Sequence, residues 1–389
     1  MESKQIHAKQ VLTPVGWVEN AIIHIEGGNI LAIEPSGKPC PHSISVLPAL
    51  IDTHIHGVMG VDTMDATHEA LNTMSCFLAQ HGVGAFLATT VTESHQRIEA
   101  ALAQVQQSIQ KGVDGACLLG SYLEGPFFNP VHKGAHPQNL LQAPDRKVLE
   151  KWLAIAQGTL KCVALAPEYP DALSIIRWLR TLNIRVMLGH TNADYQTTKS
   201  ALLAGANGVV HCYNGMSGLH HRHPGVVGAA LSVPDCQTEI IVDGHHVHPA
   251  AVAIAHRCCQ HNLLLVSDAM RATGMPNGDY YLGELLVHMQ DNVVRTDDGG
   301  LAGSALTLDR AVQHLADFSH ITFEQAWLHG SYYPAKALGV DDQLGSIAPN
   351  KHANLVLLDD THHLIATLVN GKVVYQSNQF RSEYVSYLK

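Results

Sequence analysis

The stretch Leu50-Ile51-Asp52-Thr53-His54-Ile55-His56-Gly57 decides how the chain is interpreted. It continues an apolar run, residues 46–51, that predicts a buried strand. Because side chains alternate faces along an extended chain, His54 and His56 are expected to point the same way. Two imidazoles on one face form half of a site for zinc or a similar metal ion. Surface pairs of this kind are common, so the stretch alone does not decide between a metal site and an ordinary strand end.

Short apolar runs and amphipathic stretches alternate through the middle of the chain. Further strands are predicted at residues 84–90, 117–123, 159–165, 185–190, 208–211, 239–242 and 263–267. Helices are predicted at residues 94–110, 145–156, 171–182, 194–203 and 249–260. Repeated strand–helix units indicate an α/β protein with a parallel sheet, and eight of them indicate a (β/α)8 barrel of the TIM type. In that fold the chemistry takes place where the strands end.

Most of the predicted barrel strands end in a side chain that can bind a metal or move a proton. These residues are His54, His56, Glu124, His190, His211, Asp243, His245, His246 and Asp268. Any one of them could be a turn or cap residue. Their recurrence at strand ends that a barrel brings together predicts a shared metal site.

Two metal ions fit this set better than one. The predicted ligands are His54, His56 and Asp268 for one ion, His190 and His211 for the other, and Glu124 between them. A bound divalent ion lowers the pKa of water from 15.7 toward about 7. Asp268 is placed to accept the proton of the attacking water and to deliver it to the leaving group. Zinc is the first expectation, while iron, manganese, cobalt and nickel suit the same ligands.

Both ends of the chain are rich in predicted strands. Residues 18–25 and 29–33 flank Glu26-Gly27-Gly28, and residues 365–369 and 373–376 flank Asn370-Gly371, which are hairpin signals. We therefore expect a small β-sandwich domain from residues 1–48 plus 343–389, and a catalytic barrel from residues 49–342.

Composition limits the class of protein. The chain has 389 residues, of which 46% are hydrophobic and 15% charged, and its net charge is −10. This balance argues against a nucleic-acid or anionic-membrane partner. Eight scattered cysteines, the absence of an N-terminal signal pattern and the absence of a long apolar run predict a cytoplasmic protein with free thiols. The 27 histidines form no tag-like tract.

A set of motifs spread over nearly the whole chain resembles the amidohydrolase superfamily, and within it the N-acetylglucosamine-6-phosphate deacetylase family. The motifs are Ile51-Asp52-Thr53-His54-Ile55-His56-Gly57, Leu123-Glu124-Gly125-Pro126-Phe127, Lys133-Gly134-Ala135-His136-Pro137, Leu188-Gly189-His190-Thr191, His211-Cys212-Tyr213-Asn214-Gly215-Met216, His221-Arg222-His223-Pro224-Gly225, Asp243-Gly244-His245-His246, Leu265-Val266-Ser267-Asp268-Ala269 and Leu301-Ala302-Gly303-Ser304. The resemblance implies the barrel, the terminal β domain and a homodimer.

The resemblance also implies roles for individual residues. Glu124, His190 and His211 match the metal ligands used throughout the family, whereas His54 and His56 match an extra pair found in only some members. Asp268 matches the family acid/base, and His136 could donate to the substrate carbonyl, unless it is a plain loop histidine. The implied substrate contacts are Ala135, His136, Asn214, Gly215, Arg222, Asp243, Gly244, His245, His246, Leu301, Ala302 and Gly303.

The implied reaction is deacetylation of N-acetyl-D-glucosamine 6-phosphate to D-glucosamine 6-phosphate and acetate. The arginine that matches Arg222 reaches the phosphate in the neighbouring subunit, which suits a permanently charged, planar donor. Its run, His220-His221-Arg222-His223, could instead be a solvated loop. His246 is favoured by its motif, but His245 and His248 compete with it.

Two departures from the family leave the sugar epimer open. His223 stands where most relatives have an acid, and Gly215 stands where many glucosamine-type members have alanine. The Asn214 loop and the pair His245-His246 look closer to N-acetylgalactosamine-6-phosphate deacetylases. Two remoter alternatives are another amidohydrolase and a non-catalytic protein that binds metal or sugar phosphate. Glu124 stands where enzymes of the dihydroorotase type use a carboxylated lysine, which counts against the first.

Overall fold

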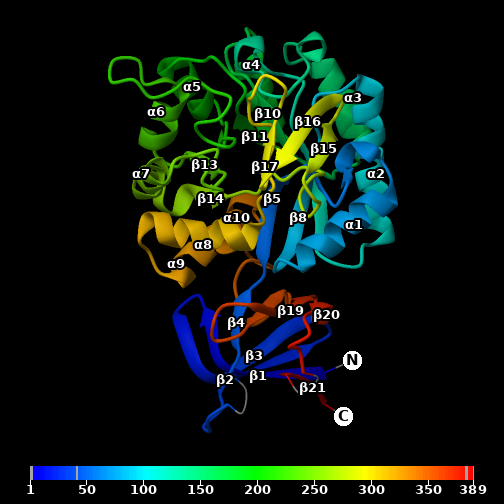
Figure 1. Cartoon of the computed structure of the whole chain (residues 1–389), viewed down its shortest axis with the longest axis vertical. Helices are drawn as coiled ribbons and strands as arrows, with labels where there is room; N and C mark the ends of the chain where they lie inside the picture. The colour runs from blue at the N-terminus through cyan, green and yellow to red at the C-terminus, as the bar shows by residue number, and fades with distance from the viewer. Residues whose placement is uncertain (1–2, 41–42, 382–383, 389) are drawn as a thin grey trace.

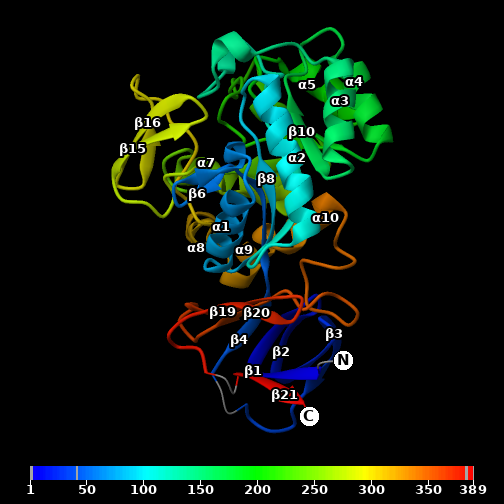
Figure 2. The same cartoon turned by 90° about the vertical axis from the view of Figure 1, so that its right-hand side faces the viewer.

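The computed structural model describes residues 3–40, 43–381 and 384–388 and has two lobes (Figures 1 and 2). The upper lobe in Figure 1 is a parallel barrel surrounded by helices, and the lower lobe is a sheet built from both ends of the chain. No helix among the described residues is long and apolar enough to cross a membrane.

The barrel contains eight parallel strands in the order predicted by the βα repeats. They are β5 (Leu50–Ile55), β8 (Val83–Thr89), β9 (Cys117–Leu123), β10 (Leu160–Leu165), β11 (Arg185–Leu188), β12 (Gly208–Val209), β13 (Gln237–Ile240) and β14 (Leu263–Leu265). Past the end of β14, the Asp268 N–H donates to the His54 carbonyl at 2.9 Å, and the His56 N–H donates to the Ala269 carbonyl at 2.9 Å. These bonds bring the last strand's loop against the first strand and nearly close the barrel at its carboxyl end.

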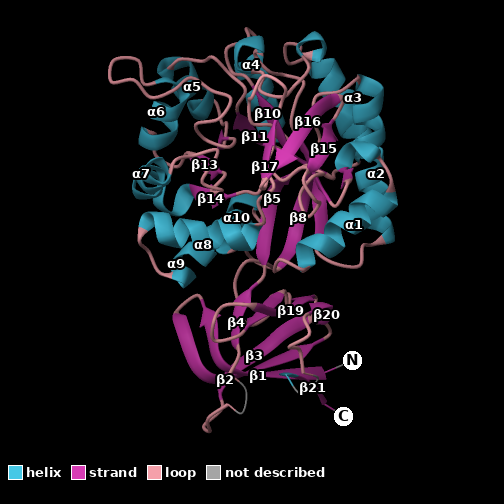
Figure 3. Cartoon of the chain, in the orientation of Figure 1, coloured by secondary structure: helices cyan, strands magenta, loops and turns pink. Residues whose placement is uncertain are grey.

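The five predicted helices are confirmed to within about a residue at each end, because local signals define their starts. Ser94, Asp145 and Asp194 each accept a backbone N–H from the first turn of the helix that follows. Figure 3 shows the helices around the barrel strands. The helices are α1 (His68–Ala79), α2 (His95–Lys111), α3 (Arg146–Ala156), α4 (Ala172–Thr181), α5 (Tyr195–Leu203), α6 (Gly225–Ser232), α7 (Pro249–Cys259), α8 (Leu308–Ser319), α9 (Phe323–Gly330) and α10 (Tyr332–Leu338).

The predicted strand at residues 46–51 is wrong as a single element. The structure divides it into β4 (Ser45–Pro48), which belongs to the terminal sheet, and β5, which begins the barrel. Pro48 has no N–H for a ladder, and the Ala49 N–H donates to the Asn354 carbonyl at 2.9 Å as the chain passes between the lobes. His54 therefore lies inside a barrel strand, and His56 directly follows it.

The lower lobe is one sheet that is antiparallel except where β1 pairs with β4. Both predicted hairpins are confirmed, with Gly27, Gly28, Asn370 and Gly371 all in the left-handed region. The remaining strands of this sheet are β1 (Ser3–Thr13), β2 (Gly16–Glu26), β3 (Asn29–Pro35), β18 (Leu355–Leu358), β19 (Leu364–Val369), β20 (Lys372–Gln376) and β21 (Val385–Leu388). The domain bounds, 1–48 plus 343–389 and 49–342, remain a prediction.

A three-stranded antiparallel sheet beside the barrel was not predicted. It consists of β15 (Gly278–Leu282), β16 (Leu285–Gln290) and β17 (Val293–Arg295), and Figure 2 shows it projecting from the barrel lobe. A short pair, β6 (Gly57–Val58) and β7 (Val61–Asp62), follows the first barrel strand. Leu282, at the end of β15, and the loop at residues 300–303, after β17, contribute to the wall of the cavity at the carboxyl end of the barrel.

Candidate metal centre and active site

A cavity of about 360 Å³ opens at the carboxyl end of the barrel strands, where the sequence predicted the chemistry. Of the residues predicted from the strand ends or from family resemblance, twelve line it: His56, Glu124, Ala135, His136, His190, His211, Asn214, Gly215, His246, Asp268, Leu301 and Gly303. The fold therefore brings together residues that lie as far apart in the chain as His56 and Gly303.

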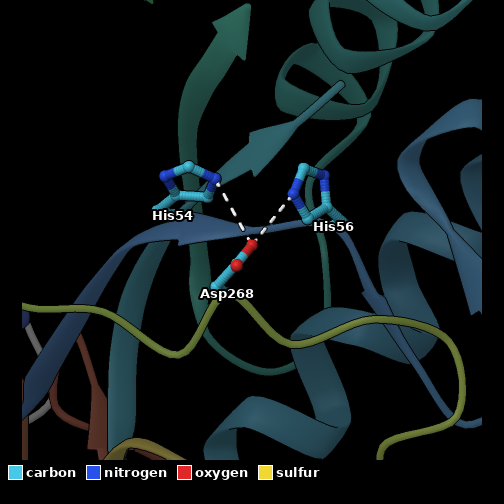
Figure 4. A group of neighbouring side chains, drawn as sticks. All are labelled: His54, His56 and Asp268. Carbon is cyan, nitrogen blue, oxygen red and sulfur yellow. Dashed lines mark ion pairs between the residues drawn. The ribbon is translucent and has the colours of Figure 1, made fainter. Parts of the chain in front are cut away.

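The first of two potential metal-binding groups consists of His54, His56 and Asp268, called here the His54 group (Figure 4). Asp268 Oδ1 lies 3.6 Å from His54 Nε2 and 3.1 Å from His56 Nε2. All three side chains are buried, and their ligand atoms lie within 4.8 Å of one another. Two nitrogens and one carboxylate oxygen form a donor set that zinc and related ions accept.

The second potential metal-binding group consists of Glu124, His190 and His211, called here the His190 group. Glu124 Oε1 lies 3.4 Å from His190 Nε2 and 3.1 Å from His211 Nε2. The same carboxylate also approaches the His54 group, at 3.5 Å from His54 Nε2 and 3.2 Å from His56 Nε2. Glu124 thus lies between the two groups, as the sequence predicted.

Hydrogen bonds leave one ring nitrogen of three histidines free to bind a metal. The Nδ1 atoms of His190 and His211 lie 2.9 Å and 3.2 Å from the backbone carbonyls of His132 and Asn214. His54 Nδ1 lies 3.2 Å from Glu239 Oε2. These oxygens act as acceptors, so each Nδ1 carries a proton and Nε2 is the nitrogen left to bind a metal ion in place of a second proton. His54 Nε2 is buried without a hydrogen-bond partner, which is what a metal ligand requires before its ion binds.

The electrostatics of the site also suit a cation. Burial alone would raise the pKa of Asp268, but hydrogen bonding to His56 and the nearby histidine charges lower it to about 2. Burial would lower the pKa of His56, yet the carboxylates of Asp268 and Glu124 raise it to about 9. The site therefore favours ionised carboxylates with positive charge between them, a role that a divalent ion can take over from protons.

Three potential ligands adopt backbone conformations that non-glycine residues seldom use. His190 and Asp268 have φ angles of 46° and 48°, in the left-handed region, and His211 has a φ of 20°, at the edge of that region. Such conformations cost about 1–3 kcal/mol each and are retained where the surrounding structure holds them. Here they follow the short strands β11, β12 and β14, and all three side chains line the cavity.

His136 has a defined tautomer. Its Nδ1 accepts the backbone N–H of Thr92 at 3.3 Å, so in the neutral ring the proton is on Nε2. Nε2 lies 3.8 Å from Glu124 Oε2. Burial and the nearby His190 keep the pKa of His136 well below its usual range, so the ring is neutral. His136 can therefore present an N–H donor to the cavity.

Among three neighbouring histidines, the geometry selects His246. His246 lines the cavity, and its Nδ1 lies 2.6 Å from Asp243 Oδ2. His245 is exposed, and His248 caps α7 by accepting the Ala250 N–H at 3.1 Å. Asp243 also accepts the backbone N–H groups of His245 and His246 at 2.8 Å each, so it shapes the loop that presents His246.

Several predicted residues do not line the cavity. Asp243, Gly244 and His245 belong to the loop behind His246, Ala302 is buried, and His54 has no exposed surface. Arg222 is exposed and lines a separate hollow with Asn192, Asp194 and Ser217. Its Nη1 lies 2.8 Å from His221 Nε2. Within one chain, Arg222 is therefore not part of the cavity wall.

Sequence reasoning missed other residues of the site. Val91, Thr92, Gly134, Pro137, Leu282 and Gly300 also line the cavity. Thr92 donates its backbone N–H to His136, and the type of a side chain gives no sign of such a contact. Glu239, which contacts His54, begins the predicted strand at residues 239–242, and a charged residue inside a buried strand was the available signal.

Comparison with known proteins shows the family to which the chain is similar. The amidohydrolase family matches residues 45–382, and the N-terminal domain of formimidoylglutamate deiminase HutF matches residues 3–42. The solved N-acetylglucosamine-6-phosphate deacetylase of Thermotoga maritima is 31% identical and superposes with a TM-score of 0.89, covering 96% of this chain and all of that one. A mutant of the Mycobacterium smegmatis deacetylase, solved in complex with N-acetyl-D-glucosamine-6-phosphate, gives a TM-score of 0.90 at 28% identity, over 97% of this chain and all of that one.

Two relatives are similar over almost their whole length. An N-acetylglucosamine-6-phosphate deacetylase of Vibrio furnissii is 50% identical over 388 residues, which are 97% of each chain. An N-acetylgalactosamine-6-phosphate deacetylase of Escherichia coli O157:H7 is 46% identical over 374 residues, or 95% of this chain and 98% of that one. With a family match over most of its length and relatives this similar, the chain belongs to the N-acetylglucosamine-6-phosphate deacetylase family of amidohydrolases.

Proposed function

We propose that this chain is a metal-dependent deacetylase of N-acetyl-D-glucosamine 6-phosphate, which it converts to D-glucosamine 6-phosphate and acetate in amino-sugar catabolism. The observation that carries the proposal is the contact of one carboxylate, Glu124, with both the His54 group and the His190 group. Asp268 and His136 line the same cavity. The similarity to the Vibrio furnissii enzyme supports the choice of substrate.

The two groups together would hold one or two divalent ions, zinc being the first candidate. The buried, unpartnered His54 Nε2 and the Nδ1 protons on His190 and His211 fit this role. When bound, such an ion polarises a carbonyl and makes water acidic enough to act as a nucleophile at neutral pH. Iron, manganese, cobalt and nickel suit the same donors.

Asp268 is the proposed general acid and base. In the reaction the oxygen of a water forms a bond to the acetyl carbon, and the bond from that carbon to nitrogen breaks. Asp268 takes a proton from the water and passes it to the departing nitrogen, so that acetate and an amine result. A pKa lowered to about 2 keeps Asp268 ionised, and therefore able to accept that proton, at neutral pH.

His136 is the proposed donor to the acetyl oxygen. Its neutral ring, with the proton on Nε2, offers an N–H without adding a charge. As the carbonyl oxygen becomes negative in the transition state, a fixed donor stabilises it more than it stabilises the substrate.

The remaining contacts are proposed to hold the sugar phosphate. Ala135, Asn214, Gly215, His246, Leu301 and Gly303 line the cavity, with Asp243, Gly244, His245 and Ala302 in the supporting loops. The protein is acidic overall, so the phosphate needs a local cation. We propose that Arg222 supplies it to the cavity of a second copy, which makes the chain a homodimer. A cytoplasmic location also stays a proposal.

The alternative substrate is N-acetyl-D-galactosamine 6-phosphate, which differs at one hydroxyl group. It is favoured by the 46% identity to the Escherichia coli O157:H7 relative and by Gly215 and His245-His246. Acetate release from the two sugar phosphates, measured side by side on one metal-analysed sample, tests both substrates. We expect the glucosamine substrate to give the larger kcat/KM. A larger value for the galactosamine substrate would reverse the epimer assignment, and no release from either would contradict the proposed function.

A further inference from the structure

One carboxylate next to the site belongs to neither ligand group. Glu239 lies in β13, and its side chain has no exposed surface. Its Oε2 lies 3.2 Å from His54 Nδ1, whereas His54 Nε2 faces Glu124 and Asp268. Glu239 therefore contacts His54 on the ring nitrogen that is turned away from the other ligands.

Tyr122 completes the surroundings of His54. Its ring centroid lies 4.7 Å from that of His54, and its hydroxyl donates to Glu239 Oε2 at 3.5 Å. Both Tyr122 and Glu239 are fully buried. The imidazole thus contacts a carboxylate at one nitrogen and packs beside an aromatic ring tilted by 51° to it, which restricts its rotation.

The histidines of the two groups differ in what holds them. His190 and His211 face backbone carbonyls at Nδ1, whereas His54 faces a carboxylate. An anionic acceptor draws the Nδ1 proton more strongly and makes the opposite nitrogen a better electron donor. The environment of His54 therefore favours tight metal binding at the His54 group in particular.

Glu239 also adds a buried carboxyl group to a region that already contains two others. Its Oε1 has no hydrogen-bond partner, and a buried ionised oxygen in that state is costly. Glu124 and Asp268, two further buried carboxylates, lie on the other side of His54. A divalent ion at the His54 group would offset this charge, so Glu239 and the ion stabilise each other.

We infer that Glu239 is a positioning residue for the metal position of the His54 group: it fixes His54 and raises the affinity of that position without acting on the His190 group. This inference rests on the proposed metal-dependent function, but it concerns only the chain's own residues. Glu239 would thus influence whether the His54 group holds a metal ion, although Glu239 belongs to neither ligand group and does not line the cavity.

Titration of the metal-depleted full-length protein with Co²⁺ tests the inference. Visible absorption counts the ions, and competition with a chelator gives a Kd for each equivalent. Glu239→Gln keeps the shape and an acceptor oxygen but loses the charge, and Glu239→Leu loses both. His56→Ala, which removes a ligand of the His54 group alone, provides the reference spectrum. Glu93→Gln is the matched control, because Glu93 is a buried carboxylate that pairs with Arg97 and accepts the Ser94 N–H.

We expect two equivalents in the wild-type protein and in Glu93→Gln. Glu239→Gln should weaken by about 10-fold only the equivalent that binds at the His54 group, which is the one missing in His56→Ala, and Glu239→Leu should weaken the same equivalent by about 100-fold. Equal weakening of both equivalents, or wild-type affinity for both equivalents in Glu239→Gln, would overturn the inference. The proposed function would be unaffected, because acetate release by the wild-type protein tests it separately. One equivalent in the wild-type protein would overturn it as well. If Glu239→Leu does not fold, the isosteric Gln variant decides.

Discussion

His136 Nδ1 accepts the backbone N–H of Thr92 at 3.3 Å, and this contact determines which ring nitrogen carries a proton toward the cavity. A main-chain donor cannot change its protonation state, so the tautomer is set by the fold. His136 therefore differs from His54, His190 and His211, whose Nδ1 atoms face acceptors. The site contains histidines of both tautomers, one type suited to donate a hydrogen bond and the other suited to bind a metal.

Replacing His136 by alanine should lower kcat by about 10²–10³-fold, because a donor to the developing oxyanion is lost. KM should change much less, since the donor acts mainly on the transition state. Steady-state acetate release together with metal analysis measures this. A variant with normal metal content and wild-type kcat would remove His136 from the catalytic scheme.

The variant Asp268→Asn should lower kcat by about 10²–10⁴-fold, because the amide cannot take the proton of water. Asn keeps the size of the side chain but removes a buried charge and a potential metal ligand, so bound metal is counted in the same sample and kcat is compared at equal metal content. His136→Ala at the same metal content serves as the comparison, because it removes a donor but leaves the base. Turnover by Asp268→Asn within a few-fold of wild type would show that another group moves the proton.

Arg222→Ala should raise KM for the 6-phosphate substrate at least 10-fold and leave the slow hydrolysis of the unphosphorylated sugar unchanged. The expected loss reflects a charge-assisted hydrogen bond from the guanidinium to phosphate. Arg146→Ala is the control, since Arg146 is an exposed arginine paired with Glu150 on α3. If Arg222→Ala and Arg146→Ala behave alike, the phosphate is bound by other residues.

Protonation of His329 should lower the free energy of unfolding as the pH becomes acidic. Burial holds its pKa at about 4, below the ordinary value of 6.5, and Nδ1 lies 2.8 Å from the Leu263 carbonyl. The unfolded chain therefore binds a proton more readily, so the stabilisation is complete above pH 6.5 and is lost as pH falls toward 4. The shift corresponds to about 3 kcal/mol.

Denaturant unfolding of the metal-loaded wild-type protein and of His329→Gln, from pH 7 to pH 4, measures this effect. The difference in unfolding free energy between the two proteins should shrink as the pH falls. A difference that stays constant over this range would mean that His329 does not titrate differently in the folded and unfolded chains.

The barrel and most of the site could be predicted because their signals are local. The apolar strands are recognisable in the sequence, and most of them are followed by a polar residue such as Glu124 or His211. N-terminal caps such as Asp145 defined the helix starts. Once parallel strands were inferred, their carboxyl ends had to meet, which placed distant ligands together.

What could not be predicted depends on contacts across the fold. The sequence does not show that Glu239 faces His54, because 185 positions separate them. Helix α6 was missed since its residues from Gly225 to Ala230 are all buried and have no polar face to reveal a helical period. The chain passes from one sheet to the other at Ala49, which divides β4 from β5. Both strands belong to one apolar run in the sequence, so only the tertiary structure shows the division.

The central claim is that the deacetylation depends on metal held by the His54 and His190 groups. The most direct measurement is acetate release from N-acetyl-D-glucosamine 6-phosphate by metal-depleted protein as Zn²⁺ is added back, with bound metal counted in the same samples. We predict negligible release without metal and recovery that is complete by about two ions per chain. Full activity in protein shown to be metal-free, unchanged by a chelator, would contradict the account.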